Sequence, residues 1–67
     1  MRERYFVYLC FGTNEQMEEL NNHLDMNGYD FSMNGMELIV HADEGDYVET
    51  IMADRNIDYI LDDVEWR

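Results

Sequence analysis

Asn34 and Gly35 stand between two short segments rich in apolar residues, the first of which alternates cleanly between apolar and polar residues. Residues 29–33 read Tyr-Asp-Phe-Ser-Met, and residues 36–41 return as Met-Glu-Leu-Ile-Val-His. Alternation is typical of a strand with one buried face, and Asn-Gly is the preferred pair for a two-residue type I′ turn. The pattern predicts a β-hairpin. Because an isolated hairpin is at best marginally stable, other elements must cover its apolar face.

A strand and a helix are predicted before this hairpin. Residues 5–11 form a continuous apolar run, which is typical of a central strand covered on both faces. Thr13 and Gln16 have the spacing of a capping box, so a helix is expected to begin after Thr13. Asn27 and Gly28 are expected to end it, with Gly28 in the left-handed conformation. The apolar stripe of this helix is predicted to be Met17, Leu20 and Leu24.

A helix and a strand are also predicted after the hairpin. Asp43 is the expected N-cap of the second helix, and Asn56 is its expected left-handed end. Residues 57–61 are expected to form the last strand, and the acidic tail, residues 62–67, is expected to fray. The inner stripe of this helix is predicted to be Tyr47, Val48, Ile51, Met52 and Arg55.

The predicted element order is β-α-β-β-α-β, which is the ferredoxin-like plan within the α+β class. Right-handed crossovers place the first and third strands in the middle of a four-stranded antiparallel sheet, with the two helices on one face. A chain of 67 residues forms one domain, residues 1–67, and buries only about 60% of the surface that its unfolded form exposes. We therefore expect a small domain with little stability to spare.

Because side chains alternate across a strand, the predicted strands divide their residues between two faces of the sheet. The helix-facing residues are expected to be Tyr5, Val7, Leu9, Phe11, Tyr29, Phe31, Met33, Met36, Leu38, Val40, Ile57, Tyr59 and Leu61. The opposite face is expected to have an apolar centre and an acidic rim, which is the usual anatomy of a protein interface. Its centre consists of Phe6, Tyr8, Ile39 and Ile60, and its other positions are Cys10, Asp30, Ser32, Glu37, His41, Asp58 and Asp62.

The chain carries sixteen acidic residues, four arginines and no lysine, so its formal net charge is −12 at pH 7. A field of this sign repels nucleic acid, anionic membranes and phosphorylated metabolites, and it attracts cationic surfaces. Four arginines cannot supply the phosphate contacts that dominate nucleic-acid affinity, so direct nucleic-acid binding is not expected. The acidic residues predicted to contact a partner are Glu15, Glu18, Glu19, Asp46, Glu49, Asp58, Asp62 and Asp63, and Trp66 is predicted to join them as an aromatic anchor.

These features favour a non-enzymatic, acidic protein-binding module that inhibits or modulates a basic partner, such as a nucleic-acid-handling protein. Rigidly held carboxylates could imitate phosphates, as in the small lysine-poor acidic inhibitors of phages and mobile elements. A second hypothesis is a regulatory homodimer that binds a small ligand at the loop of residues 11–14, between the first strand and the first helix. A third is a structural dimer formed through the open sheet face, in which the acidity serves only solubility.

No residue set in the chain has the pattern of a catalytic, cofactor or metal site. His23 and His41 have no convincing catalytic companion in the sequence, and His41 with Asp43 gives only two potential metal ligands. Cys10 is expected to be a buried, reduced thiol. The apolar run of residues 5–11 is too short to span a bilayer and has no cleavage site after it, so a cytoplasmic protein is expected.

Overall fold

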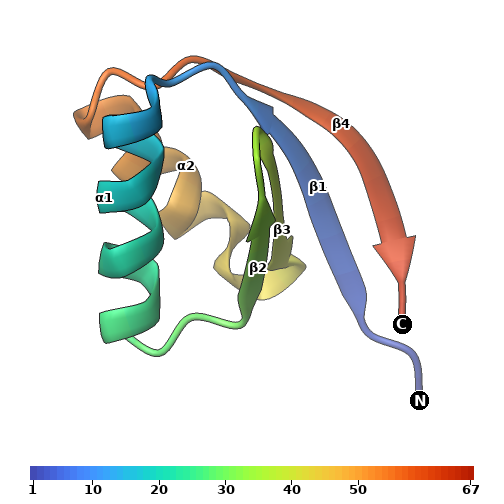
Figure 1. The fold of residues 1–67 in the computed structure, drawn as a ribbon. Helices are drawn as coiled ribbons and strands as arrows, with labels where there is room; N and C mark the ends of the chain where they lie inside the picture. The colour runs from blue at the N-terminus through green and yellow to red at the C-terminus, as the bar shows by residue number, and fades with distance from the viewer.

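The computed structural model describes residues 1–67 and confirms the α+β class (Figure 1). Its elements are β1 (Arg4–Cys10), α1 (Asn14–Met26), β2 (Phe31–Asn34), β3 (Glu37–His41), the 3-10 turn η1 (Ala42–Glu44), α2 (Gly45–Asp54) and β4 (Tyr59–Trp66). The four strands form one antiparallel sheet in the order β2-β3-β1-β4. Figure 1 shows both helices on the same side of this sheet.

The first helix begins and ends as predicted. The Thr13 hydroxyl accepts the Gln16 amide proton at 3.1 Å, and the Gln16 side chain accepts the Thr13 amide proton at 2.9 Å, which completes the capping box. Gly28 has a φ of +72°, which few residues other than glycine adopt. The predicted stripe of Met17, Leu20 and Leu24 is buried against the sheet, and each fully buried leucine contributes about 2 kcal/mol through the area removed from water.

The hairpin forms, but its turn lies one residue later than predicted. Asn34 pairs with Glu37 as the last residue of β2, so the two residues of the turn are Gly35 and Met36. Gly35 has a φ of +62° whereas Asn34 and Met36 do not have positive φ, which is the arrangement of a type II′ turn with glycine first. The change moves the pairing by two residues and therefore leaves the predicted faces of both strands unchanged.

The second helix begins differently from the prediction. His41, and not Asp43, is the capping side chain: its Nδ1 accepts the Asp43 amide proton at 3.1 Å and starts the turn η1, from which α2 continues at Gly45. On α2, Val48 and Met52 are fully buried as predicted, and Asn56 ends the helix with a φ of +58°. The predicted burial of Tyr47 is wrong, because its ring is two-thirds exposed.

The face assignment of β1 is inverted relative to the prediction. Phe6 lies opposite Val40 and Tyr8 lies opposite Leu38, and directly opposite residues share a face. Phe6 and Tyr8 therefore pack against the helices, and Tyr8 is 0% exposed. The buried cluster between the sheet and the helices consists of Tyr8, Cys10, Met17, Leu20, Leu24, Leu38, Val40, Val48, Met52 and Ile57.

The C-terminal end of β1 and the acidic tail of the chain also differ from the prediction. β1 ends at Cys10, which leaves Phe11 half exposed outside the sheet. The acidic tail does not fray: β4 runs from Tyr59 to Trp66 and pairs with β1 along its whole length. The register shifts between Val7 and Tyr8, which leaves Asp62 as the extra residue of a β-bulge. The paired ends of β1 and β4 carry the two termini side by side, away from the helices (Figure 1).

Candidate protein-binding surface

The sheet face opposite the helices is not covered by any element of the chain (Figure 1). Strand pairing arranges its side chains in three rows, because residues directly opposite each other point to the same side. The rows are Asn34-Glu37-Leu9-Ile60, then Ser32-Ile39-Val7-Asp63, then Asp30-His41-Tyr5-Glu65. We call this the open face. It contains four acidic residues and no arginine.

The open face has the predicted anatomy of an apolar centre with an acidic rim, but with different residues from β1. Val7 and Leu9 take the places predicted for Phe6 and Tyr8, whereas Ile39 and Ile60 lie where they were expected. Val7 is nearly fully buried by its neighbours on this face, and Leu9 and Ile39 are half-buried. The apolar area that a partner could reach is therefore smaller than predicted and lies toward Ile60 on β4.

The strand β4 lies at the margin of the sheet and carries the largest group of exposed apolar residues. Ile60, Leu61, Val64 and Trp66 are between 38% and 59% exposed. Asp62 and Asp63 lie among them, at the bulge. Ile60 belongs to the open face, whereas Leu61, Val64 and Trp66 lie on the helix side beyond the ends of the helices. We call the strand with these side chains the β4 margin.

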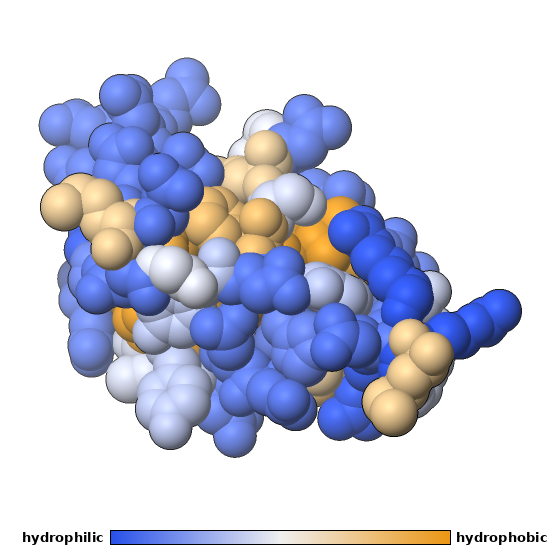
Figure 2. Space-filling model, turned by 90° about the horizontal axis from the view of Figure 1, so that it is seen from below, coloured by the Kyte–Doolittle hydropathy of each residue, from blue (hydrophilic) through white to orange (hydrophobic).

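Seen from below, most of the visible surface is hydrophilic, and apolar residues reach it near the centre (Figure 2). Isolated exposed apolar residues are normal in soluble proteins, whereas contiguous apolar groups with a polar rim are characteristic of interfaces. The open face and the β4 margin are contiguous, since both include Ile60 and Asp63. Together they form a band of apolar and acidic residues that continues from the open face around the β4 edge of the sheet.

The acidic residues predicted on the helices lie apart from this surface. Glu15, Glu18 and Asp46 are exposed and make no side-chain hydrogen bond or ion pair within the chain. Glu19 lies 3.8 Å from Arg55, which joins the end of α2 to α1. The helix side and the β4 side thus offer two separate groups of carboxylates to a cationic partner.

Glu49 differs from the other acidic residues on the helices, because it is held by the sheet. Its carboxylate accepts the hydroxyl proton of Tyr8 at 2.6 Å and that of Tyr59 at 3.2 Å. The Tyr8 and Tyr59 rings also meet edge to face, with centroids 5.6 Å apart. Glu49 was predicted to contact a partner; in the structure it joins α2 to β1 and β4.

The arginines compensate few of these charges. Arg67 bonds Glu65 at 2.9 Å and lies over the Tyr5 ring, and Arg4 lies over the Phe6 ring. Arg55 contacts Glu19, so none of these arginines forms an ion pair with Asp58, Asp62 or Asp63. Such exposed ion pairs contribute about 0–1 kcal/mol each. Three of the four arginines, Arg2, Arg4 and Arg67, lie near the two termini.

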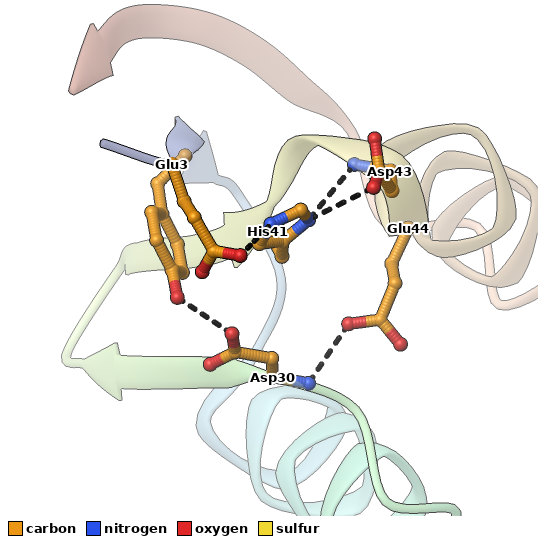
Figure 3. Close-up of polar contacts among 6 residues, drawn as sticks. Glu3, Asp30, His41, Asp43 and Glu44 are labelled. Atoms are coloured by element: carbon orange, nitrogen blue, oxygen red, sulfur yellow. Dashed lines mark hydrogen bonds and ion pairs between the residues drawn. The ribbon is translucent and has the colours of Figure 1, made fainter. Parts of the chain in front are cut away.

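His41 lies in a polar cluster at one end of the open face (Figure 3). Its Nε2 lies 3.6 Å from Glu3 Oε1, and its ring meets the Tyr5 ring edge to face at 5.2 Å. The Tyr5 hydroxyl donates to Asp30 at 2.6 Å, and the Asp30 amide donates to Glu44 at 2.9 Å. These contacts join β1, the start of β2 and the turn η1, so a structural role accounts for the cluster.

The loop between β1 and α1, where the second hypothesis places a small ligand, is filled by its own side chains. A Cβ at Gly12 would lie 3.1 Å from Met17 Sδ and 3.3 Å from Gln16 Oε1. The Thr13 amide already donates to Gln16. An open hollow of about 560 Å³ occurs elsewhere, between the end of α2 and the start of β4, and is lined by Ala53, Asn56, Ile57, Asp58 and Tyr59.

No three His, Cys, Asp or Glu side chains are grouped so that they could hold a metal ion. No helix has the length and apolar character needed to cross a membrane. Cys10 is fully buried with its Sγ 3.6 Å from Met52 Sδ, and burial raises the pKa of its thiol from 9.0 to about 11. The protonated thiol is the form present at neutral pH, so Cys10 is not an activated nucleophile.

Three tyrosines share this shift toward the protonated form. Burial, followed by the hydrogen bond to Glu49, raises the pKa of Tyr8 above its ordinary value of 10.0. The same two causes raise the pKa of Tyr59, and the hydrogen bond to Asp30 raises that of Tyr5. In each case a carboxylate accepts the hydroxyl proton, so ionisation would remove the donor and place two negative charges together.

The raised pKa values predict a loss of stability at alkaline pH. A raised pKa in the folded state stabilises the fold fully below the unfolded value, and this contribution is lost as the pH rises toward the folded value. The groups whose pKa is raised are Cys10, Tyr5, Tyr8 and Tyr59, and the chain has no lysine that would lose its charge in the same pH range. We expect the free energy of unfolding, measured by urea titration, to fall between about pH 9 and about pH 11. The Tyr8→Phe variant should show a shallower fall, and an identical fall would contradict the role of Tyr8.

Of the residues predicted to contact a partner, the structure places Ile60, Asp62, Asp63 and Trp66 on β4 and Asp58 just before it, and it places Ile39 on β3, across Val7 from Asp63. Phe6 and Tyr8 lie on the helix side, and the acidic residues of the helices lie apart. Sequence reasoning missed Leu61 and Val64 as exposed residues of the same strand, because it assigned Leu61 to the core and Val64 to a frayed tail. Along β4, Ile60, Asp63 and Glu65 lie on one face and Leu61, Val64 and Trp66 on the other, a pattern that could have indicated a strand. The extra residue Asp62 interrupts it.

Comparison with protein-family models, with curated proteins and with solved structures finds no match to this chain.

Proposed function

We propose that this chain is a non-enzymatic, acidic protein-binding module that modulates or inhibits a basic partner. The observation that carries the proposal is the combination of exposed apolar and acidic side chains on the open face and the β4 margin, where Asp62 and Asp63, and Asp58 just before the strand, have no ion pair with a cation. Apolar side chains supply contact area, whereas the carboxylates attract and orient a cationic surface.

A nucleic-acid-binding protein is the partner class that this proposal favours, because such proteins present the basic surfaces that a net charge of −12 attracts. The chain would then occupy a phosphate-binding surface as a competitor of nucleic acid. We also propose that the domain is ferredoxin-like, which the sheet order β2-β3-β1-β4 with two helices on one face supports. A cytoplasmic location is part of the same proposal, and the buried free thiol of Cys10 is compatible with it.

The proposal predicts partner binding that weakens sharply as salt increases. Attraction between exposed charges is screened within about 10 Å at 0.1 M ionic strength, so added salt should mainly slow association. The experiment is a tagged pull-down at low salt, followed by kinetic measurement of the enriched basic protein over a salt series. Binding that does not respond to salt would contradict the proposal, and recovery of the chain alone at dimer mass would favour a structural homodimer.

Two matched double variants separate the two groups of carboxylates. Glu15→Gln with Glu18→Gln, and Asp62→Asn with Asp63→Asn, remove the same number of charges from the helix side and from the β4 side. If the β4 side binds the partner, the second variant should slow association several-fold more than the first, because neutralisation acts most strongly near the contact. Equal effects would show that only the net charge matters.

A further inference from the structure

We propose that the free edge of β4 binds an extended, cationic segment of the partner, which pairs with Tyr59–Leu61 as an additional strand of the sheet. This inference rests on the proposed function, because it takes the partner to be basic. It adds the mode of binding, which is hydrogen bonding to the main chain of β4 with selection of positively charged side chains beside it.

The main chain of Tyr59 and Leu61 is directed away from β1. The Phe11 amide donates to the Asp58 carbonyl at 2.7 Å, whereas the Cys10 amide donates to Met36, on the other side of β1. Cys10 lies opposite Tyr59, so Tyr59 belongs to a pair that exchanges no hydrogen bonds across the two strands. By the alternation of antiparallel strands, Ile60 bonds β1 and Leu61 again points outward.

These outward groups have no other partner in the chain. None of the main-chain hydrogen bonds outside the helices and strands involves Tyr59 or Leu61. A strand edge with free amide and carbonyl groups is a template for another extended segment. Pairing at Tyr59 and Leu61 would satisfy two amides and two carbonyls.

The other half of β4 offers no comparable stretch of free main chain. The bulge at Asp62 interrupts the regular edge, and the Asp63 carboxylate accepts the Val64 amide proton at 2.8 Å. Bulges and charged side chains at an edge are the usual means of preventing uncontrolled strand addition. The main chain of Trp66 also points away from β1, but the bulge and the bonded Val64 amide separate it from Tyr59–Leu61, which is the longest uninterrupted free segment of this edge.

The side chains beside this segment favour a peptide in which positively charged and apolar residues alternate. Ile60 and Leu61 are each 51% exposed and lie on opposite sides of the strand, so either face of an added strand meets an apolar side chain. The hollow next to Tyr59 combines the apolar Ala53 and Ile57 with the Asp58 carboxylate. That lining suits a lysine or arginine, whose stem is apolar and whose end is charged.

A second copy of this chain is the poorer occupant of the same edge. Two β4 strands pairing through Tyr59–Leu61 would bring Asp58 and Asp62 of each copy close to the same residues of the other. Like charges opposite each other destabilise strand pairs. Charge complementarity thus favours a cationic segment over self-association.

The test uses a short synthetic peptide in which lysine alternates with valine, and the amide hydrogen exchange of the protein measured by NMR. We expect the exchange of the Tyr59 and Leu61 amides to slow at least about tenfold when peptide is present, because new hydrogen bonds protect them. Phe31 and Met33, whose amides point outward on β2 by the same alternation, are the internal controls and should not change. A peptide of glutamate and valine should give no protection.

Two substitutions at one position separate the main-chain bond from the side chain. Leu61→Ala removes the side chain and keeps the amide, whereas Leu61→Pro also removes an outward amide proton, which an edge strand tolerates. We expect Leu61→Pro to bind the lysine-valine peptide at least about tenfold more weakly than Leu61→Ala, the equivalent of about 1.4 kcal/mol. If Leu61→Pro does not fold, the same peptide methylated at alternate amides replaces it and should lose the protection.

Several results would overturn the edge mode of binding. One is slower exchange of the control amides of Phe31 and Met33, and another is equal protection of the Tyr59 and Leu61 amides by the glutamate peptide. A third is protection of these amides that rises with protein concentration when no peptide is present. The last is the absence of any protection at a saturating concentration of the lysine-valine peptide. Salt-sensitive binding that maps to the open face or the helices would overturn this inference and leave the proposed function standing. Absence of salt-sensitive binding to any basic protein or peptide would remove the proposed function itself.

Discussion

Replacing Gly45 by valine is expected to lower the free energy of unfolding by about 3 kcal/mol, at the upper end of the range for inserting atoms into a packed core. A Cβ at Gly45 would lie 2.6 Å and 2.8 Å from two ring carbons of Phe6 and 3.2 Å from the Tyr8 hydroxyl. The backbone of Gly45 is ordinary helix, with φ −56° and ψ −45°, so the requirement for glycine is steric. The Phe6 ring is held edge to face with Tyr8 and beneath Arg4, which limits its movement.

The Gly45→Ala variant separates the steric clash with the Phe6 ring from the effect of helix propensity. Alanine is favoured over glycine inside a helix by about 1 kcal/mol, so Gly45→Ala would stabilise the protein if the Phe6 ring could move freely. We expect it to destabilise instead. Urea unfolding of Gly45→Ala alone and combined with Phe6→Leu gives the coupling between the two sites, and the smaller side chain should recover most of the loss. Additive effects would contradict the clash.

A comparably large effect is expected from Glu49→Ala, about 3 kcal/mol of unfolding free energy. The substitution removes the acceptor of two tyrosine hydroxyls and leaves that of Tyr8, a fully buried side chain, without a partner. A domain of this length has a total stability of roughly 3–10 kcal/mol, so this loss would leave a large unfolded fraction. Urea unfolding followed by the fluorescence of Trp66 or by circular dichroism measures it.

Glu18→Ala is the matched control for Glu49→Ala, because it removes the same charge from an exposed helix position without breaking a contact within the chain. In a chain of net charge −12 that control relieves repulsion and should be nearly neutral. Tyr8→Phe removes the donor as well, so Glu49→Ala should cost less in that background than in the wild type. If Glu49→Ala proves no more destabilising than Glu18→Ala, the hydrogen bonds to Glu49 do not hold α2 on the sheet.

Glu49 also shows why an acidic residue cannot be assigned to a surface from sequence. Its position on a predicted helix with many carboxylates made it one of several equivalent partner-binding residues. Only the approach of Tyr8 and Tyr59, which are far away in the chain, turns it into an internal acceptor. By contrast, Glu15 and Glu18 meet no such partner and remain exposed, as their sequence context predicted.

The β1 strand illustrates the same dependence on distant residues. Its seven residues are almost all apolar, so alternation gives no indication of which set faces the helices. The choice follows from pairing with β3: Leu38 and Val40 pack against the helices, and the register places Tyr8 and Phe6 opposite them on the same face. A pairing prediction between the two strands, rather than the pattern of either one, would have been needed.

Features that depend on neighbours within a few residues could be predicted from the sequence: the capping box of Thr13 and Gln16, the left-handed ends at Gly28 and Asn56, the hairpin, and the net charge. Their hydrogen bonds and steric limits are local, so residue type and spacing are enough to predict them. The faces of β1 and the ordering of the tail as β4 depend instead on the tertiary structure. Each of these follows from contacts between segments far apart in the chain, and their energies favour one register only when all the elements pack together.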